Sequence, residues 1–312
     1  MRFGTVAMLG RSNVGKSTFL NAALGEPLAI VSPLPQTTRD TLLGIARHGE
    51  AEIAFWDTPG LHPPRSELGR RMNAAALEAA RAADVVVLMT DVTTLLGPRH
   101  GRKRPTDPID PLDRKLVESL PPAAATPSVL VVNKVDLLRD KSRLLPLMEA
   151  FGRLHEFCAA VPTSVTRRDG TMLVLDEIAS RLPEGPPAYD ADTLTDRPVT
   201  FFIREYIREQ VLLVATREVP HAVAVSVDSV QESPRLLVVQ ATLHVEKTGQ
   251  RKILVGRAGS QIKRIGSAAR LRIQELVGKK VHLELFVRVT PRWRNAARLL
   301  AELGYDAESG AR

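Results

Sequence analysis

The stretch Gly10-Arg11-Ser12-Asn13-Val14-Gly15-Lys16-Ser17 decides the fold of the first half of this 312-residue chain. It has the spacing GxxxxGKS, follows the apolar run Phe3–Leu9 and precedes the helical pattern Thr18–Leu24, as a phosphate-binding loop requires. Such a loop lets consecutive backbone N–H groups and a helix N-terminus surround a polyphosphate. We expect Lys16 to neutralise the β- and γ-phosphates and the Ser17 hydroxyl to hold Mg²⁺. The loop alone does not distinguish ATP from GTP.

The composition predicts a cytoplasmic globular protein of two domains. Hydrophobic residues make up 44% of the chain and charged residues 25%, and no apolar run reaches the roughly 18 residues of a membrane-spanning helix. Met1-Arg2-Phe3 does not begin a secretory signal. The single cysteine, Cys158, excludes an internal disulfide framework and most zinc sites, and its apolar neighbours predict a buried, inert thiol.

The positive charge of the chain is concentrated in its C-terminal third. Residues 197–312 hold 20 of the 43 Lys and Arg and 11 of the 35 Asp and Glu, a net charge of +9, which leaves 23 against 24, or −1, for residues 1–196. This asymmetry indicates a polyanionic partner, with nucleic acid first and an anionic membrane surface second. A basic surface that is merely solvated remains the alternative.

Apolar strands alternate with helical segments in residues 1–182, which predicts an α/β fold with a mostly parallel sheet and helices on both faces. The polar segment Ser32–Asp40 is expected to be a mobile loop. Asp57-Thr58-Pro59-Gly60 follows a predicted strand, so that Asp57 can join the magnesium shell and the Gly60 N–H can meet a γ-phosphate. The predicted strands are Phe3–Leu9, Glu52–Trp56, Asp84–Thr90, Ser128–Val132 and Ala159–Pro162.

The sequence Asn133-Lys134-Val135-Asp136 follows another predicted strand and selects the base. The Asp136 carboxylate can accept two hydrogen bonds from one edge of guanine. Adenine offers no such pair of donors, and a buried carboxylate left unpaired rejects it. In this order after GxxxxGKS and DxxG, the NKxD pattern predicts GTP as the ligand.

Together these motifs and Gln36-Thr37-Thr38-Arg39-Asp40 resemble the Era family of the translation-factor-like GTPases. The resemblance implies that Thr38 closes onto magnesium and the γ-phosphate, with Thr37 as the neighbouring candidate. The family's guanine-supporting Ser-Ala is represented here by Ser164 and Val165. The expected nucleotide-binding residues are Gly10, Arg11, Ser12, Asn13, Val14, Gly15, Lys16, Ser17, Thr18, Asp57, Thr58, Pro59, Gly60, Asn133, Lys134, Asp136, Ser164 and Val165. The expected catalytic residues are Lys16, Thr38 and Gly60, and the expected magnesium ligands are Ser17, Thr38 and Asp57.

Three positions and one loop depart from common GTPase patterns or add to them. Leu61 stands where many GTPases place a water-orienting glutamine, which predicts slow intrinsic turnover. His62 is read either as an exposed structural residue or as a substitute base. By the resemblance, Asn13 is expected to hold a potassium ion against the phosphates. The loop Gly97–Pro111 is longer and more basic than the family requires, and is read as a solvated loop or as an RNA contact.

Residues 183–196 are predicted to be a linker, and residues 197–312 a smaller α+β domain. The order helix–strand–strand–helix–helix–strand is that of a type II KH domain, and Gly256-Arg257-Ala258-Gly259 is its GxxG loop, which clamps about four nucleotides of single-stranded RNA. Trp293 is read as a base-stacking residue or as packing against the C-terminal helix. The predicted RNA-binding residues are Gly256, Arg257, Ala258, Gly259, Lys263 and Arg264.

The resemblance implies a GTPase that binds the 3′ region of 16S ribosomal RNA and assists assembly of the small ribosomal subunit. It implies a monomer that meets the inner face of the cell membrane only peripherally. The residues alone lead to a GTP-regulated binder of single-stranded RNA. Two alternatives stay open: a membrane-surface GTPase whose basic domain meets anionic lipid, and a non-enzymatic RNA-binding protein with nucleotide as a structural ligand. GTPases of the Der type need two phosphate loops, and this chain has one.

Overall fold

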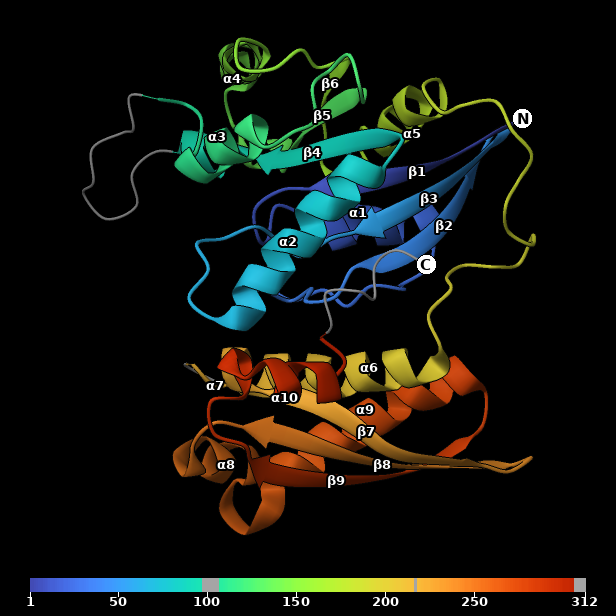
Figure 1. Ribbon diagram of the computed structural model, residues 1–312, viewed down its shortest axis with the longest axis vertical. Coiled ribbons are helices and arrows are strands. Elements are labelled where there is room, and N and C mark those ends of the chain that lie inside the picture. The colour runs from blue at the N-terminus through green and yellow to red at the C-terminus, as the bar shows by residue number, and fades with distance from the viewer. Residues whose placement is uncertain (97–106, 216–217, 306–312) are drawn as a thin grey trace.

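Buried apolar strands make the first part of the chain a six-stranded sheet (Figure 1). The computed structural model describes residues 1–96, 107–215 and 218–305. All neighbouring strands of this sheet are parallel except one antiparallel pair at the edge. The order across the sheet is β2 (Leu42–His48), β3 (Ala51–Asp57), β1 (Arg2–Leu9), β4 (Val85–Asp91), β5 (Ser128–Asn133) and β6 (Ala159–Pro162).

The five predicted strands are confirmed, and the sixth, β2, was missed. It pairs antiparallel with β3. The segment Leu42–His48 is apolar, but it follows a polar loop and contains Gly44, so it gave no alternating pattern. The two residues Gly49 and Glu50 between the strands are the hairpin signal that could have identified it.

Helices cover both faces of the sheet, as predicted. Val6 and Met8 belong to the core beneath one face and Ala7 and Leu9 to the core beneath the other, and all four are fully buried. This alternation along β1 is the two-residue period of a strand buried on both sides. The first face is covered by α1 (Lys16–Leu24) and α5 (Thr171–Ala179), the second by α2 (Glu67–Ala82), α3 (Pro111–Glu118) and α4 (Leu144–Gly152).

The segment predicted to be a linker lies along the edge strand β2. The Ile45 N–H donates to the Leu194 carbonyl at 2.9 Å. The Glu52 carboxylate accepts from the N–H groups of Ala188 and Tyr189 at 2.8 and 3.1 Å. Because these contacts cover a sheet edge that would otherwise be open, much of the linker is anchored to the first domain.

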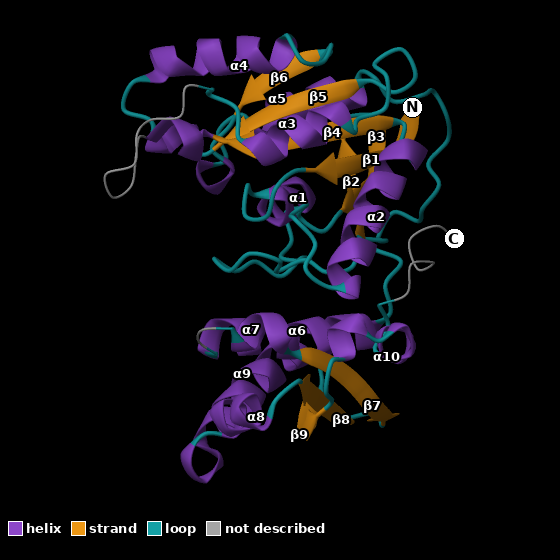
Figure 2. Cartoon of the chain, turned by 60° about the vertical axis from the view of Figure 1, so that its left-hand side comes forward, coloured by secondary structure: helices purple, strands orange, loops and turns teal. Residues whose placement is uncertain are grey.

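The second unit is a three-stranded sheet with helices on one face, and it lies below the first in Figures 1 and 2. Strand β8 pairs antiparallel with β7 and parallel with β9. Helices α6 and α9 pack on the same face through Ile207, Val211, Ile265 and Ile273. The type II KH order is confirmed by α6 (Val199–Val214), α7 (Val219–Ala222), β7 (Ala224–Glu232), β8 (Leu236–Val245), α8 (Thr248–Val255), α9 (Ser260–Val277) and β9 (Lys280–Val289), followed by α10 (Ala297–Glu302).

Two side-chain predictions need correction or a decision. Cys158 is exposed rather than buried, because it precedes the edge strand β6. Trp293 is fully buried and donates its Nε1–H to the Ala222 carbonyl at 2.9 Å, so the base-stacking reading is wrong.

Most of the predicted loop Gly97–Pro111 lies outside the described residues. None of the described helices is long and apolar enough to cross a membrane.

Candidate nucleotide and RNA sites

The phosphate loop connects β1 to α1 at the carboxyl edge of the parallel strands. Gly15 has φ +116°, and a Cβ there would lie 2.2 Å from Nδ2 of Asn133. A Cβ at Gly60 would lie 2.5 Å from Cα of Ser12. Only glycine therefore lets the loop approach both the NKxD segment and the DTPG turn this closely.

The Lys16 amine lies over the phosphate loop. Its Nζ donates to the carbonyls of Gly10 and Arg11, each at 3.1 Å. Burial lowers the pKa of Lys16 to about 8, although the Asp57 carboxylate counteracts part of that effect. An anionic ligand in this loop would restore the full charge of the amine.

The three predicted magnesium ligands meet at one point. The Ser17 hydroxyl donates to Oδ2 of Asp57 at 2.6 Å and lies 2.9 Å from the Thr38 hydroxyl. The other oxygen of Asp57, Oδ1, is buried without a hydrogen-bond partner among the described residues. Burial raises the pKa of Asp57, and Lys16 offsets part of the increase. Two hydroxyls and an orphaned carboxylate oxygen fit Mg²⁺, which prefers oxygen ligands and completes its shell with phosphate and water.

Thr38 rather than Thr37 belongs to this cluster. The Thr37 hydroxyl is used within its own loop, where it contacts Ser32 at 2.7 Å and donates to the Leu34 carbonyl at 2.7 Å. Among the described residues, no group of three or more His, Cys, Asp and Glu side chains could hold a metal ion. A magnesium site here would therefore depend on hydroxyls and on the phosphates of the ligand.

The NKxD side chains connect three separate loops. Asn133 Nδ2 donates to the Val14 carbonyl at 2.8 Å, and its Oδ1 accepts from the N–H of Val165 at 3.2 Å. The Asp136 carboxylate accepts from the Ser164 hydroxyl at 2.6 Å. Ser164 and Val165 therefore lie beside the NKxD segment, as predicted. Val165 makes its contact through its backbone N–H, so the valine side chain can stand in place of the family's alanine.

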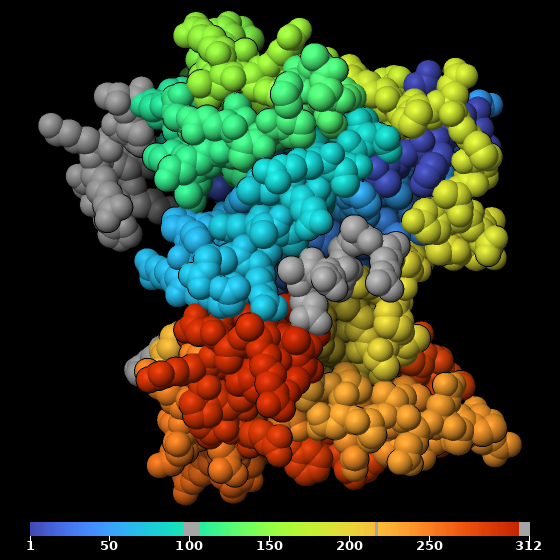
Figure 3. Space-filling model, in the orientation of Figure 1, coloured from blue at the N-terminus to red at the C-terminus, as the bar shows by residue number. Residues whose placement is uncertain are grey.

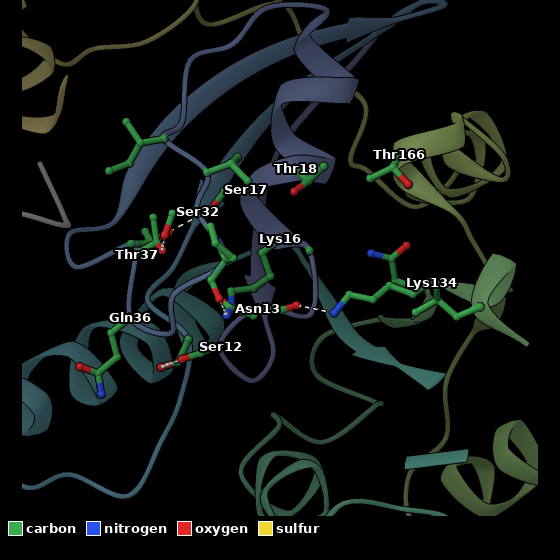
Figure 4. Close-up of a pocket in the computed structure, with 18 of the residues that line it drawn as sticks. Ser12, Asn13, Lys16, Ser17, Thr18, Ser32, Gln36, Thr37, Lys134 and Thr166 are labelled. Atoms are coloured by element: carbon green, nitrogen blue, oxygen red, sulfur yellow. Dashed lines mark hydrogen bonds between the residues drawn. The ribbon is translucent and has the colours of Figure 1, made fainter. Parts of the chain in front are cut away.

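Lys16, Ser17, Thr38, Asn133 and Asp136 border one pocket of about 440 Å³, a size that suits a small-molecule ligand. Figure 4 shows Lys16 and Asn13 on one side of it and Lys134 and Thr166 on the other. Its lining adds residues that the sequence did not indicate. These are Ile30, Val31, Ser32, Pro33, Gln36, Leu137 and Thr166.

Eight predicted residues are not among those that line this pocket: Gly10, Arg11, Val14, Asp57, Thr58, Pro59, Ser164 and Val165. The Arg11 guanidinium points to α3, where its Nε lies 2.9 Å from Asp113 and its Nη1 3.3 Å from Asp110. The Thr58 hydroxyl donates to the Met8 carbonyl at 2.6 Å. Both positions could contribute backbone groups to a ligand, but their side chains hold the loops in place.

Asp91, at the end of β4, was missed by the sequence analysis. Its carboxylate accepts from Lys134 Nζ at 2.6 Å and lies 3.5 Å from Arg11. Burial opposes ionisation of Asp91, but hydrogen bonds from Lys134 and Thr93 outweigh it and lower its pKa. It thus joins the phosphate loop to the NKxD segment. A lone aspartate at a strand end carried no motif that could have singled it out.

His62 has a structural place. Its Nδ1 lies 3.1 Å from the Gly60 carbonyl, and its own carbonyl accepts from Asn73 of α2 at 2.8 Å. The residue therefore holds the DTPG turn to the start of α2, which agrees with a structural role, but it is half-buried rather than exposed as expected.

The GxxG loop joins α8 to α9. Gly256, Ala258 and Gly259 have φ of +73°, +50° and +76°. Arg257 and Ala258 are exposed, as are Lys263 and Arg264 in the first turns of α9. The loop and the first turns of α9 therefore present backbone and three cations to solvent at a helix N-terminus, an arrangement that suits a sugar–phosphate chain.

Comparison with known proteins agrees with this arrangement. A family described as "50S ribosome-binding GTPase" matches residues 5–134, and the KH domain family matches residues 218–294. GTPase Era of Ruminiclostridium cellulolyticum is 39% identical over 303 residues, covering 97% of each chain. GTPase Era of Leuconostoc citreum is 40% identical over 308 residues, covering 98% of this chain and 97% of the relative. This chain belongs to the Era family of GTPases.

Solved Era structures share the complete architecture of this Era-family chain. One is Era in complex with MgGDPNP and nucleotides 1506–1542 of 16S ribosomal RNA, and it matches with a TM-score of 0.88 and 32% identity, covering 98% of this chain and 99% of that one. A tyrosine-to-alanine variant of Aquifex aeolicus Era bound to GDP·AlF₄⁻ matches with the same score, identity and coverage. The expected resemblance and fold class are confirmed.

Proposed function

We propose that this Era-family GTPase hydrolyses GTP and binds the 3′ region of 16S ribosomal RNA during assembly of the small ribosomal subunit. The support for GTP is Asp136, which lines the same pocket as the phosphate loop and accepts a hydrogen bond from the Ser164 hydroxyl. The support for RNA is the exposed GxxG loop and its cations. The solved relative bound to MgGDPNP and 16S RNA unites both ligands in one protein.

In this proposal Ser17, Thr38 and Asp57 hold Mg²⁺, which would neutralise charge on the β- and γ-phosphates. Lys16 stabilises the same phosphates from the loop side, and the Gly60 N–H donates to the γ-phosphate. Leu61 follows Gly60, and its backbone N–H is already engaged with the Gly10 carbonyl at 3.1 Å. Because its side chain cannot orient a water molecule, intrinsic hydrolysis should be slow, with phosphate release over minutes to hours.

The bound nucleotide is proposed to control RNA binding, and the observation that carries this is the position of Arg39 and Asp40. They follow Thr38 directly, and their side chains are only 4% and 11% exposed. Arg39 donates to the Val223 carbonyl at 2.6 Å, and Asp40 pairs with Arg204 at 2.6 Å. The residue proposed to close onto the γ-phosphate is therefore continuous with two residues that hold the KH domain.

The test is RNA affinity in two nucleotide states. Binding of a 3′ 16S RNA oligonucleotide is measured with GDP and with GDPNP at fixed salt, because phosphate contacts make the affinity strongly salt-dependent. A coupling of about 1–3 kcal/mol predicts an affinity ratio of roughly 5–150-fold. Equal affinities would show that the two domains are only tethered. Liposomes of anionic lipid, tested in the same salt, separate RNA binding from the membrane alternative.

Potassium is proposed as a second cation at Asn13. The Asn13 amide lies 2.7 Å from the Pro33 carbonyl, so this side chain meets the loop that carries Thr38 next to the phosphate site. An amide oxygen and a backbone carbonyl are the kind of ligands that a monovalent cation takes. Replacing K⁺ by Na⁺ at constant ionic strength should then slow hydrolysis in the wild type. The Asn13→Ala variant should be insensitive to the exchange, and an unchanged wild-type rate would remove Asn13 from the mechanism.

We further propose that the protein acts as a cytoplasmic monomer that meets the inner face of the cell membrane only peripherally. The basic C-terminal third supports contact with an anionic surface. Sedimentation with and without anionic vesicles at physiological salt tests both parts of this proposal.

A further inference from the structure

The chain continues past the KH family match, which ends at residue 294, into a segment that packs on the GTPase domain. We call residues Trp293–Tyr305 the C-terminal clasp. Trp293 and Leu300 are fully buried, and the Trp293 and Tyr305 rings stack with centroids 5.9 Å apart. These contacts give the clasp a defined shape, with α10 at its centre.

The clasp contacts the first turns of α2, the helix that follows the DTPG turn. The Glu67 N–H donates to Oδ1 of Asn295 at 3.1 Å, and Arg71 donates to the Tyr305 carbonyl at 3.0 Å. Figure 3 shows the part of the clasp that is coloured red directly below the light-blue start of α2. Apolar side chains of both domains form one buried cluster there, made of Leu68, Met72, Ala224, Trp293, Leu300, Leu303 and Tyr305.

The same two rings also meet the loop that carries Thr38. The Arg39 guanidinium lies 5.9 Å from the centre of the Trp293 ring. Arg204, the partner of Asp40, lies 5.6 Å from the centre of the Tyr305 ring. Both loops that border the γ-phosphate position therefore lead to one aromatic pair, which joins Trp293 at the end of the KH family match to Tyr305 beyond it.

The clasp is not needed to form the RNA groove. In Figure 1, α10 lies beside α6 on the side of the KH domain that faces the GTPase domain, whereas α8 and the GxxG loop lie on the opposite side. A segment that touches α2 but lies away from the GxxG loop suits transmission of a signal rather than contact with nucleic acid.

We propose that the C-terminal clasp is the docking surface through which the start of α2 reports the nucleotide state to the KH domain. The occupant of this surface is α2 of the same chain, and this inference rests on the proposed control of RNA binding by GTP. A shift of the DTPG turn on GTP binding moves Glu67 and Arg71, and with them Asn295 and Tyr305. The clasp then changes the presentation of the KH domain without changing its groove.

The test compares two variants of the full-length protein. Asn295→Ala combined with Arg71→Ala removes two polar contacts between α2 and the clasp and leaves the apolar cluster intact. Arg298→Ala is the matched control, because its side chain lies on the same segment, is 90% exposed and pairs with Glu302 of its own helix. The measured quantity is the ratio of RNA affinities with GDPNP and with GDP.

In the double variant the ratio of RNA affinities with GDPNP and with GDP should fall by at least about threefold. Its RNA affinity in the presence of GDP and its affinity for GDP should stay at the wild-type values. The control should keep the full ratio. A double variant that retains the wild-type ratio overturns the role of the clasp and leaves the nucleotide switch in place. A wild-type ratio of one overturns the switch itself, and the clasp proposal with it.

A second measurement does not depend on RNA. The chain has two tryptophans, so Trp56→Phe leaves Trp293 as the sole tryptophan emitter. Exchange of GDP for GDPNP should shift Trp293 emission in this background, and the added Asn295→Ala and Arg71→Ala substitutions should reduce the shift. An emission spectrum that is identical in both nucleotide states would count against the clasp.

Discussion

Asp40 and Arg204 form an ion pair of 2.6 Å that links the loop carrying Thr38 to the first helix of the KH domain. Both side chains are nearly buried, at 11% and 13% exposure. Arg204 also lies 5.1 Å from the centre of the Phe201 ring. An ion pair in this position connects the proposed magnesium ligand to the RNA-binding domain through one intervening residue.

Asp40→Asn should therefore lower both stability and coupling. It leaves the Arg204 guanidinium in a nearly buried site without its main partner, which costs about 3 kcal/mol of unfolding free energy for a buried pair. The affinity ratio between GDPNP and GDP for RNA should fall as well. Urea unfolding and RNA titration check the two effects. Asp192→Asn, an exposed carboxylate of the linker, is the control and should change neither quantity.

Asp136→Asn should change the base that the pocket selects. The substitution replaces an acceptor with an amide and removes a charge-assisted pair of hydrogen bonds to guanine, a loss of about 3 kcal/mol or more. Xanthine nucleotide, which presents the complementary pattern, should bind the variant better than GTP does. Competition titration with GDP and XDP measures this. Wild-type GDP affinity in the variant would show that Asp136 does not read the base.

Lys16 should make nucleotide binding depend on pH. Burial lowers its pKa to about 8 from the ordinary 10.5, whereas phosphate in the loop would favour the charged amine. Binding should thus take up a proton above pH 8, and GDP affinity should decrease as the pH rises, approaching tenfold per unit. Calorimetry in buffers of different ionisation enthalpy should show more proton uptake at pH 8.5 than at pH 7.5. Equal uptake at the two values would contradict the prediction.

The same shift has a consequence for the nucleotide-free protein. Between pH 8 and 10.5 the Lys16 amine is largely protonated in the unfolded chain and largely neutral in the folded one. Below pH 8 it is charged in both states, and burial of that charge lowers the free energy of unfolding. The unfavourable contribution of Lys16 to the free energy of unfolding is relieved as the pH rises through the window. Urea midpoints of the wild type and Lys16→Met at pH 7.5 and 9.5 should converge at the higher pH.

Arg257→Asp combined with Ala258→Asp should abolish RNA binding and spare nucleotide binding. Two carboxylates in the GxxG loop repel the phosphate chain, at a loss of about 1–3 kcal/mol for each contact removed. Ala258 has φ +50°, a conformation that aspartate adopts more readily than alanine, so the loop should keep its shape. Lys280→Asp, an exposed charge reversal at the start of β9, is the control. RNA affinity equal to the wild type would place the RNA elsewhere on the KH domain.

The amino-acid sequence by itself determined the nucleotide site and the class of both domains. Its motifs lie at the carboxyl ends of β1, β3 and β5, and parallel strands bring those ends to one edge of a sheet whatever the rest of the chain does. The GxxG loop was equally local, because two glycines between two helical patterns define the turn. Strand β2 was missed because its apolar residues do not alternate.

Only the tertiary structure decided which residues connect these sites. Asp91 and Arg204 belong to no motif, and the motif that contains Asp40 does not name its partner; the partners of these residues lie between 43 and 164 positions away in sequence. Trp293 and Cys158 were decided in the same way, since burial depends on which elements pack nearby and not on neighbouring residues. Local spacing encodes a loop that binds a ligand, whereas the contact of two domains depends on surfaces that exist only after each has folded.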